Sequence, residues 1–159
     1  MGVSTFTEDI KSPIAPARIF KAGVLDARNL LPKLLPDKIK SIEVQGSGGP
    51  GTIEQINLAE GSHSKCVKHQ IDEIDKENFI CKHTVTEGVV IGDKIKKIVE
   101  TAKFEASPDG GSICKTTSEY HTVDDYKVTE EERKTARDMA RRVYKVVEAY
   151  LLENPNAYA

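Results

Sequence analysis

The chain has 159 residues, of which 38% are hydrophobic and 30% charged, and its formal net charge is −2. This length suits one domain with its own core, and the small net charge gives no electrostatic argument for binding nucleic acid. No apolar run reaches the roughly 20 residues that cross a membrane, so we expect no membrane partner.

The N-terminal part of the chain predicts one strand and two short helices. Residues 3–11 are polar with scattered β-forming side chains, which suits a first strand. Residues 15–25 place their apolar side chains near helical spacing. A second short helix is expected over residues 26–35, with Pro32 and Pro36 disrupting or ending it.

Six further strands are expected next, each separated from its neighbour by turn-forming residues. They cover residues 38–44, 52–59, 65–74, 78–87, 94–106 and 112–122. The connections are a glycine-rich loop at 46–51 and the turns at 60–62, 75–77, 88–93 and 108–111. Short connections between such strands predict an antiparallel meander, which has seven strands when the first one is included.

The last element is a long amphipathic helix. Thr129 and Glu132 have the spacing of a capping box, which predicts the helix start, and Asn154-Pro155 ends it. Its apolar side chains follow helical spacing: Ala136, Met139, Ala140, Val143, Tyr144, Val147, Tyr150 and Leu151. The inner face of the sheet is the only apolar surface large enough to receive this stripe.

Strand alternation predicts a polar inner face. His69, His83, Glu100 and Tyr120 share that face with apolar neighbours, and each unpaired buried polar group costs about 1–3 kcal/mol. A hydrated or ligand-filled cavity between sheet and helix would satisfy them. The side chains expected to line it are Leu30, Ile39, Ile56, Leu58, Val67, His69, Cys81, His83, Val85, Ile98, Glu100, Ala102, Tyr120, Met139 and Val143.

Three interpretations compete for the histidines on this face. In a hairpin register that sets residue 69 opposite residue 83, His69 and His83 would lie beside Cys81 and could form a three-ligand zinc site. Orientation of a ligand is the favoured interpretation, and structural histidines bonded to neighbours are the third. We expect no metal and no cofactor.

Glu100, Tyr120 and His83 also suggest acid–base chemistry. An apolar wall would raise the pKa of a carboxyl towards the working range of a general base, with Tyr120 or His83 as the acid. The alternative is a carboxylate neutralised by a histidine, or one turned to solvent by a β-bulge.

Four glycines, Gly46, Gly48, Gly49 and Gly51, lie in one short loop. Such a loop can aim several N–H groups at an anion, whereas the alternative is a rigid hairpin whose N–H groups pair internally or with water. The three cysteines, Cys66, Cys81 and Cys114, are an odd number at wide spacing, and no secretory signal is visible. This favours reduced thiols in a cytoplasmic protein.

The chain resembles the birch-pollen-allergen family, the class-ten pathogenesis-related proteins of plants. The motifs that carry the resemblance are Met1-Gly2-Val3, Pro16-Ala17-Arg18-Ile19-Phe20-Lys21-Ala22, Val24-Leu25-Asp26, Asn29-Leu30, Gly48-Gly49-Pro50-Gly51-Thr52-Ile53, Val67-Lys68-His69, Ile71-Asp72-Glu73-Ile74-Asp75, Gly110-Gly111-Ser112-Ile113, Tyr120-His121-Thr122 and Glu148-Ala149-Tyr150-Leu151-Leu152. It implies an α+β fold of the START-like helix-grip type. In that fold a curved seven-stranded antiparallel sheet wraps around the C-terminal helix, two short helices close one end, and a cavity lies inside.

The resemblance also implies a function for residues 1–159 as a single ligand-binding domain. Family members are mostly cytoplasmic monomers that bind small hydrophobic or amphipathic plant metabolites, such as flavonoids, cytokinins, steroids or fatty acids, and some are allergens. Some relatives are enzymes of alkaloid biosynthesis, and some members have been proposed to be ribonucleases. Of the residues on which that proposal depends, only Glu148 and Tyr150 are present here, which weakens it.

The chain departs from the family pattern at several cavity positions. Gly23, Cys66, Cys81 and His83 replace frequent aromatics, and Arg28 stands where the mouth is frequently acidic. We therefore expect a wider or more polar pocket, in an intracellular binding protein.

Overall fold

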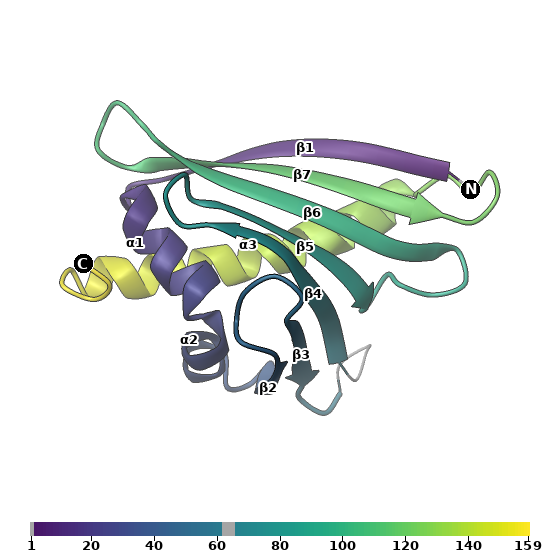
Figure 1. Ribbon diagram of the computed structural model, residues 1–159, viewed down its shortest axis with the longest axis horizontal. Coiled ribbons are helices and arrows are strands. Elements are labelled where there is room, and N and C mark those ends of the chain that lie inside the picture. Colours follow the sequence, from purple (N-terminus) through teal and green to yellow (C-terminus); the bar gives the residue numbers. More distant parts are fainter. Residues whose placement is uncertain (1, 62–65) are drawn as a thin grey trace.

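The structure is a computed structural model that describes residues 2–61 and 66–159 (Figure 1). The strands are β1 (Gly2–Ser12), β2 (Ile39–Gln45), β3 (Ile53–Leu58), β4 (Cys66–Asp75), β5 (Ile80–Glu87), β6 (Ile95–Ala106) and β7 (Ser112–Thr122). The helices are α1 (Pro16–Phe20), the π-helical turn η1 (Lys21–Leu25), α2 (Ala27–Leu34) and α3 (Glu130–Glu153). Met1 and the predicted residues Ser62 and Lys65 lie outside the described range.

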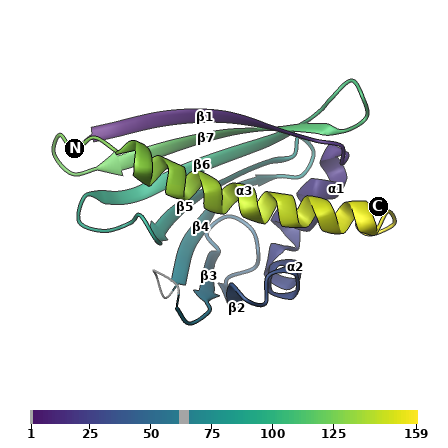
Figure 2. The same cartoon turned by 180° about the vertical axis from the view of Figure 1, so that it is seen from behind.

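The predicted architecture is confirmed. The described strands form one antiparallel sheet of seven strands in the order β1-β7-β6-β5-β4-β3-β2. Figures 1 and 2 show α3 crossing one face of this sheet, with α1, η1 and α2 at the end where the C-terminus lies. The pairing of β4 with β5 shifts register between Lys68 and His69 and again between Ile71 and Glu73. Such bulges bend a strand and increase its twist, which helps the sheet curve around the helix.

Two local predictions about the short helices need correction. The helix expected over residues 15–25 is α1 followed by the π-turn η1. Pro32 does not end its helix, because α2 continues to Leu34. A proline so close to the helix end removes only one backbone hydrogen bond, so the last residues still follow helical geometry.

The apolar core is divided into two clusters. The first joins α1, η1, α2 and the end of α3, and its most buried side chains include Phe20, Val147 and Leu151. The second lies at the other end of the sheet and consists of Val85, Ile95, Ile98 and Tyr120, with partly buried neighbours such as Phe6, Tyr126 and Ala136. His69, His83 and Glu100 lie in the middle of the inner face and belong to neither cluster, whereas Tyr120 is part of the second.

The start of α3 is fixed to the sheet by specific contacts. The predicted capping box is present: the backbone N–H of Glu132 donates to Thr129 Oγ1 at 3.0 Å, and that of Thr129 donates to Glu132 Oε1 at 2.9 Å. The guanidinium of Arg133 lies 3.8 Å from the centre of the Phe6 ring on β1. The cap satisfies N–H groups that a helix start otherwise leaves unpaired.

Candidate functional site

The candidate site is the polar middle of the inner face, where cross-strand pairs bring side chains together. One row runs across four neighbouring strands, from His83 to Glu100, Ser118 and Phe6. Paired residues of an antiparallel sheet point to the same face, so these side chains are direct neighbours. Figure 2 shows α3 lying over this face.

The predicted register of the histidine hairpin is wrong. His69 pairs with Val85 and Ile71 pairs with His83, because the bulges in β4 displace the strands relative to a regular hairpin. The two imidazole rings are therefore diagonal neighbours, with centroids 4.7 Å apart and an interplanar angle of 40°. Among residues 2–61 and 66–159, no group of three or more His, Cys, Asp or Glu side chains is arranged to hold a metal ion.

Glu54 is a site residue that sequence reasoning missed. Its carboxylate is 2.8 Å from His69 Nε2 and 3.8 Å from Arg28 Nη2 of α2. The residue is only 8% exposed. It alternates with Ile56 and Leu58 on β3, so the signal that could have found it is the same strand alternation that assigned those two residues to the inner face.

Glu100 and His83 lie close together without a hydrogen bond. His83 Nε2 is 4.0 Å from Glu100 Oε1, which is too long for one. Burial, with a smaller contribution from the neighbouring His69, lowers the pKa of His83 to about 3. Burial raises the pKa of the Glu100 carboxyl, against a smaller opposing effect of His69. His83 is therefore neutral at pH 7 and can offer one donor and one acceptor.

Both side chains nevertheless keep accessible surface. The exposed fraction is 29% for the His83 side chain and 35% for that of Glu100. The two residues lie on central strands of the sheet, on the face that α3 covers. Side chains that are desolvated by their surroundings and still accessible are typical of the wall of an internal space.

We expect His83 to make the protein sensitive to acid. Its pKa is about 6.5 in an unfolded chain and about 3 when folded, so below pH 6.5 the unfolded state takes up a proton that the folded state does not. This lowers the free energy of unfolding by roughly 2–3 kcal/mol between pH 7 and pH 4.5, and the loss grows towards pH 3. Urea unfolding at pH 7 and pH 4.5 measures it.

In this experiment, His83→Gln should lose less stability between the two pH values than the wild-type chain. His121→Gln, on the opposite face of the sheet, is the matched control and should leave the loss unchanged. An equal loss in wild type and His83→Gln would show that His83 protonates freely in the folded protein.

The other residues predicted to line a cavity divide between the two clusters. Leu30 and Ile39 are nearly fully buried in the first cluster, with 4% and 6% exposure. Ile56, Cys81, Ala102 and Val143 are partly buried against that cluster, whereas Val67, Val85, Ile98 and Tyr120 belong to the second. Leu58 and Met139 are partly exposed. The structure thus brings His69, His83, Glu100 and their neighbours together, and places Leu30 and Ile39 in tight packing.

Tyr120 occupies the second cluster beside the polar row. It is 4% exposed and meets the ring of Phe6 edge-on, with centroids 5.5 Å apart. Burial raises the pKa of its hydroxyl, and the charge of Glu100 adds to this. Tyr120 therefore stays protonated at neutral pH and could serve as a hydrogen-bond donor.

The glycine loop uses part of its backbone within the fold. The N–H of Gly48 donates to Thr52 Oγ1 at 2.9 Å, and that of Gly51 donates to the carbonyl of Ile71 at 2.8 Å. Gly46 has a φ of 131°, and a Cβ there would lie 2.7 Å from Thr52 Oγ1. These contacts favour the rigid-hairpin interpretation over an anion site.

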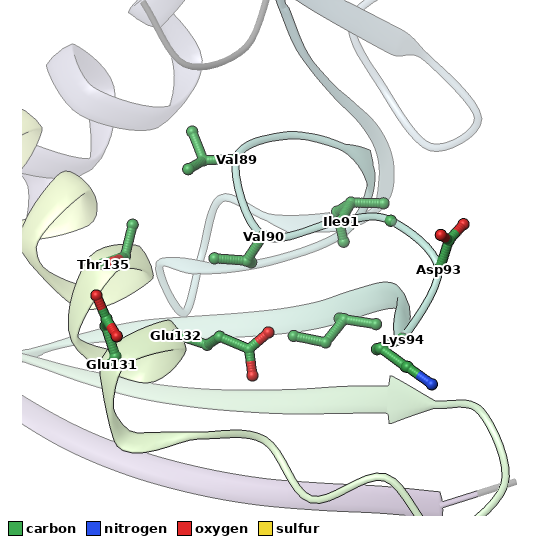
Figure 3. Close-up of a pocket in the computed structure, with 10 residues that line it drawn as sticks. Val89, Val90, Ile91, Asp93, Lys94, Glu131, Glu132 and Thr135 are labelled. Atoms are coloured by element: carbon green, nitrogen blue, oxygen red, sulfur yellow. The ribbon is translucent and has the colours of Figure 1, made fainter.

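A pocket that the sequence did not predict opens beside the start of α3 (Figure 3). Its volume is about 430 Å³, and it lies between the β5–β6 loop and the first turns of the helix. It is lined by Val89, Val90, Ile91, Gly92, Asp93, Lys94, Ile95, Glu131, Glu132 and Thr135. A second pocket of about 400 Å³ borders Ser12 and the β6–β7 turn. Neither pocket is lined by residues of the polar row.

The comparisons with known proteins agree with this geometry. The profile of the family described as "Pathogenesis-related protein Bet v 1 family" matches residues 1–154. The chain is 49% identical to major strawberry allergen Fra a 1.07 of Fragaria ananassa, over 99% of both chains. It is 45% identical to pathogenesis-related protein STH-2 of Solanum tuberosum, over 100% of both.

Solved structures of other proteins have the same fold as this chain. The crystal structure of Ara h 8.0201 superposes with a TM-score of 0.87 and 38% identity, covering 96% of this chain and 100% of that one. Norcoclaurine synthase from Thalictrum flavum has a TM-score of 0.73 over 96% of this chain and 88% of that one. It is only 19% identical, so it shows the fold alone. In the part of the chain described, no helix has the length and hydropathy needed to cross a membrane.

Proposed function

The chain belongs to the pathogenesis-related protein Bet v 1 family, and we propose that it holds an amphipathic plant metabolite between the inner face of its sheet and α3. Proteins of this family bind small hydrophobic ligands. The observation that carries the proposal is the accessible surface of His83 and Glu100, 29% and 35%, in the middle of a face covered by α3. A solid core would leave no such surface.

The division of the core into two clusters supports the same proposal. An apolar body can contact partly buried side chains of both clusters, while the polar row between them orients hydroxyl or amine groups. This is the usual composition of a ligand site, a mostly apolar wall with a few placed polar groups. We propose flavonoids, cytokinins, steroids and fatty acids as candidate ligands. We further propose that residues 1–159 act as a single domain, monomeric and cytoplasmic.

Titration with a fluorescent apolar probe tests this function. We expect N-phenyl-1-naphthylamine to bind with a stoichiometry of one and micromolar affinity, and to be displaced by one of the candidate ligand classes. Circular dichroism checks that the sample is folded. A folded sample that binds neither the probe nor any candidate ligand would mean that the inner face is packed shut, and would overturn the proposal.

One observation favours a second function, acid–base catalysis on a bound metabolite. Burial raises the pKa of Glu100, which is the direction that suits a general base, and the protonated Tyr120, whose pKa burial and the charge of Glu100 raise, is the candidate acid. His83 is neutral at pH 7 and therefore does not suit the acid role. Incubating each bound ligand and analysing the products tests it. An enzyme should lose turnover by about 10²-fold or more in Glu100→Gln while still binding the ligand, whereas a carrier forms no product.

A further inference from the structure

The carboxylates in the middle of the inner face differ in their partners. Glu54 has His69 at 2.8 Å and Arg28 at 3.8 Å. Glu8 on β1 is paired with Arg141, which reaches it from α3. Glu100 has His83 at 4.0 Å, and no lysine or arginine among the described residues forms an ion pair with it. The charge of His69 lowers the pKa of Glu100, against the larger effect of burial. Two of the three carboxylates therefore have an arginine beside them, and the central one has none.

The direct cross-strand neighbours of Glu100 are hydrogen-bonding groups and not lysine or arginine side chains. Ser118 on β7 and His83 on β5 are its direct cross-strand neighbours, and both are partly accessible. A hydroxyl and a neutral imidazole can each accept a hydrogen bond. Along β6, the next inward side chain is that of Ala102, which is small and only partly buried. Glu100 therefore has two hydrogen-bond acceptors as its direct cross-strand neighbours.

A carboxylate that its surroundings partly desolvate is unfavourable in its charged form unless a cation lies beside it. A protonated amine offers three N–H donors and a positive charge, which match the carboxylate and the two flanking acceptors. A phenol or alcohol offers one donor and no charge, so it leaves the carboxylate largely uncompensated. The phosphate or carboxylate group of an anionic ligand would be repelled.

We propose that Glu100 is the counter-ion of a protonated amine, and that the ligand class this protein prefers is an amphipathic amine. The ammonium group lies at Glu100 between His83 and Ser118, and the apolar body extends over Ala102 towards α3. The inference rests on the proposed function, because it assigns a ligand class to the same space.

A matched pair of probes tests the inference. 1-Naphthylmethylamine and 1-naphthylmethanol have nearly the same shape, but only the amine is charged at pH 7. By calorimetric titration we expect the wild-type protein to bind the amine at least about tenfold more tightly, the range of one charge-assisted hydrogen bond. In Glu100→Gln this preference should disappear, while affinity for the alcohol changes by less than about threefold.

Glu119→Gln is the control, because it makes the same change on the outer face of β7 and should keep the preference. A second readout is the titration of the Glu100 carboxyl by carbon-13 NMR, which needs no variant. Bound amine should lower the pKa of Glu100, and bound alcohol should not.

The possible failures can be told apart. Equal affinity for the two probes in the wild-type protein, or a Glu100 pKa that the amine leaves unchanged, would overturn the inference while leaving the proposed function standing. Failure of both probes, together with all candidate ligands, to bind a folded sample would overturn the proposed function itself.

Discussion

Ala102→Phe is expected to weaken ligand binding at least about tenfold, or about 1.4 kcal/mol, while leaving the protein as stable as the wild type or more so. Ala102 lies on the inner face between Cys81 and Thr116 and is only partly buried. If the space beside it is open, a phenyl ring fills it and gains apolar burial. The ring then occupies the volume that a ligand needs.

A tightly packed face gives the opposite result. Overpacking a filled core costs typically 1–3 kcal/mol, because side chains and backbone must shift. Probe titration and urea unfolding of the same variant therefore distinguish the two cases. Thr101→Phe places the same ring on the opposite face of β6 and should leave the affinity unchanged. A variant that is strongly destabilised and still binds the probe normally would contradict the proposed location of the site.

Gly111→Ala is expected to cause the largest loss of stability, at least about 3 kcal/mol, because no space exists for a methyl group. A Cβ at this position would lie 2.2 Å from the carbonyl oxygen of Ser12, and 3.0 Å and 3.1 Å from backbone atoms of Pro13. These neighbours are backbone, so they cannot rotate away. Relief requires separating the end of β1 from β7, where the chain leaves the sheet to enter α1.

Urea unfolding measures this effect, with Gly92→Ala as the matched control. A Cβ at Gly92 meets no atom within 4 Å, so that variant should change the free energy of unfolding by less than about 1 kcal/mol. Similar stability of the two variants would show that the end of β1 is looser than the structure indicates. Because β1 and α1 border the first cluster, Gly111→Ala should also weaken probe binding.

Strand alternation and turn chemistry predicted much of the fold. The predicted strands agree with the observed ones to within two residues at the described ends, and the capping box at Thr129 and Glu132 is present. Alternation also assigned His83, Glu100 and Tyr120 to one face correctly, since the strand pairing places them in adjacent rows. Strand bounds, the helix cap and the face of a strand on which a side chain lies are local properties, so residues close together in the sequence determine them.

The parts that could not be predicted depend on the whole sheet. The bulges in β4 accompany the bend of the sheet around α3, and they replaced the expected pairing of His69 with His83 by a diagonal contact. Glu54 was overlooked because a charged residue beside a glycine loop is ordinarily solvent-exposed, whereas here His69 and Arg28 compensate its charge.

The central claim is that a ligand occupies the space between the inner face and α3. NMR spectroscopy of isotopically labelled protein with one equivalent of 1-naphthylmethanol tests it most directly. The account predicts intermolecular contacts from the naphthyl ring to the methyl groups of Ala102, Thr116 and Val143. Contacts confined to the loop pocket of Val89, Val90 and Ile91, or no saturable contact in a folded sample, would contradict it.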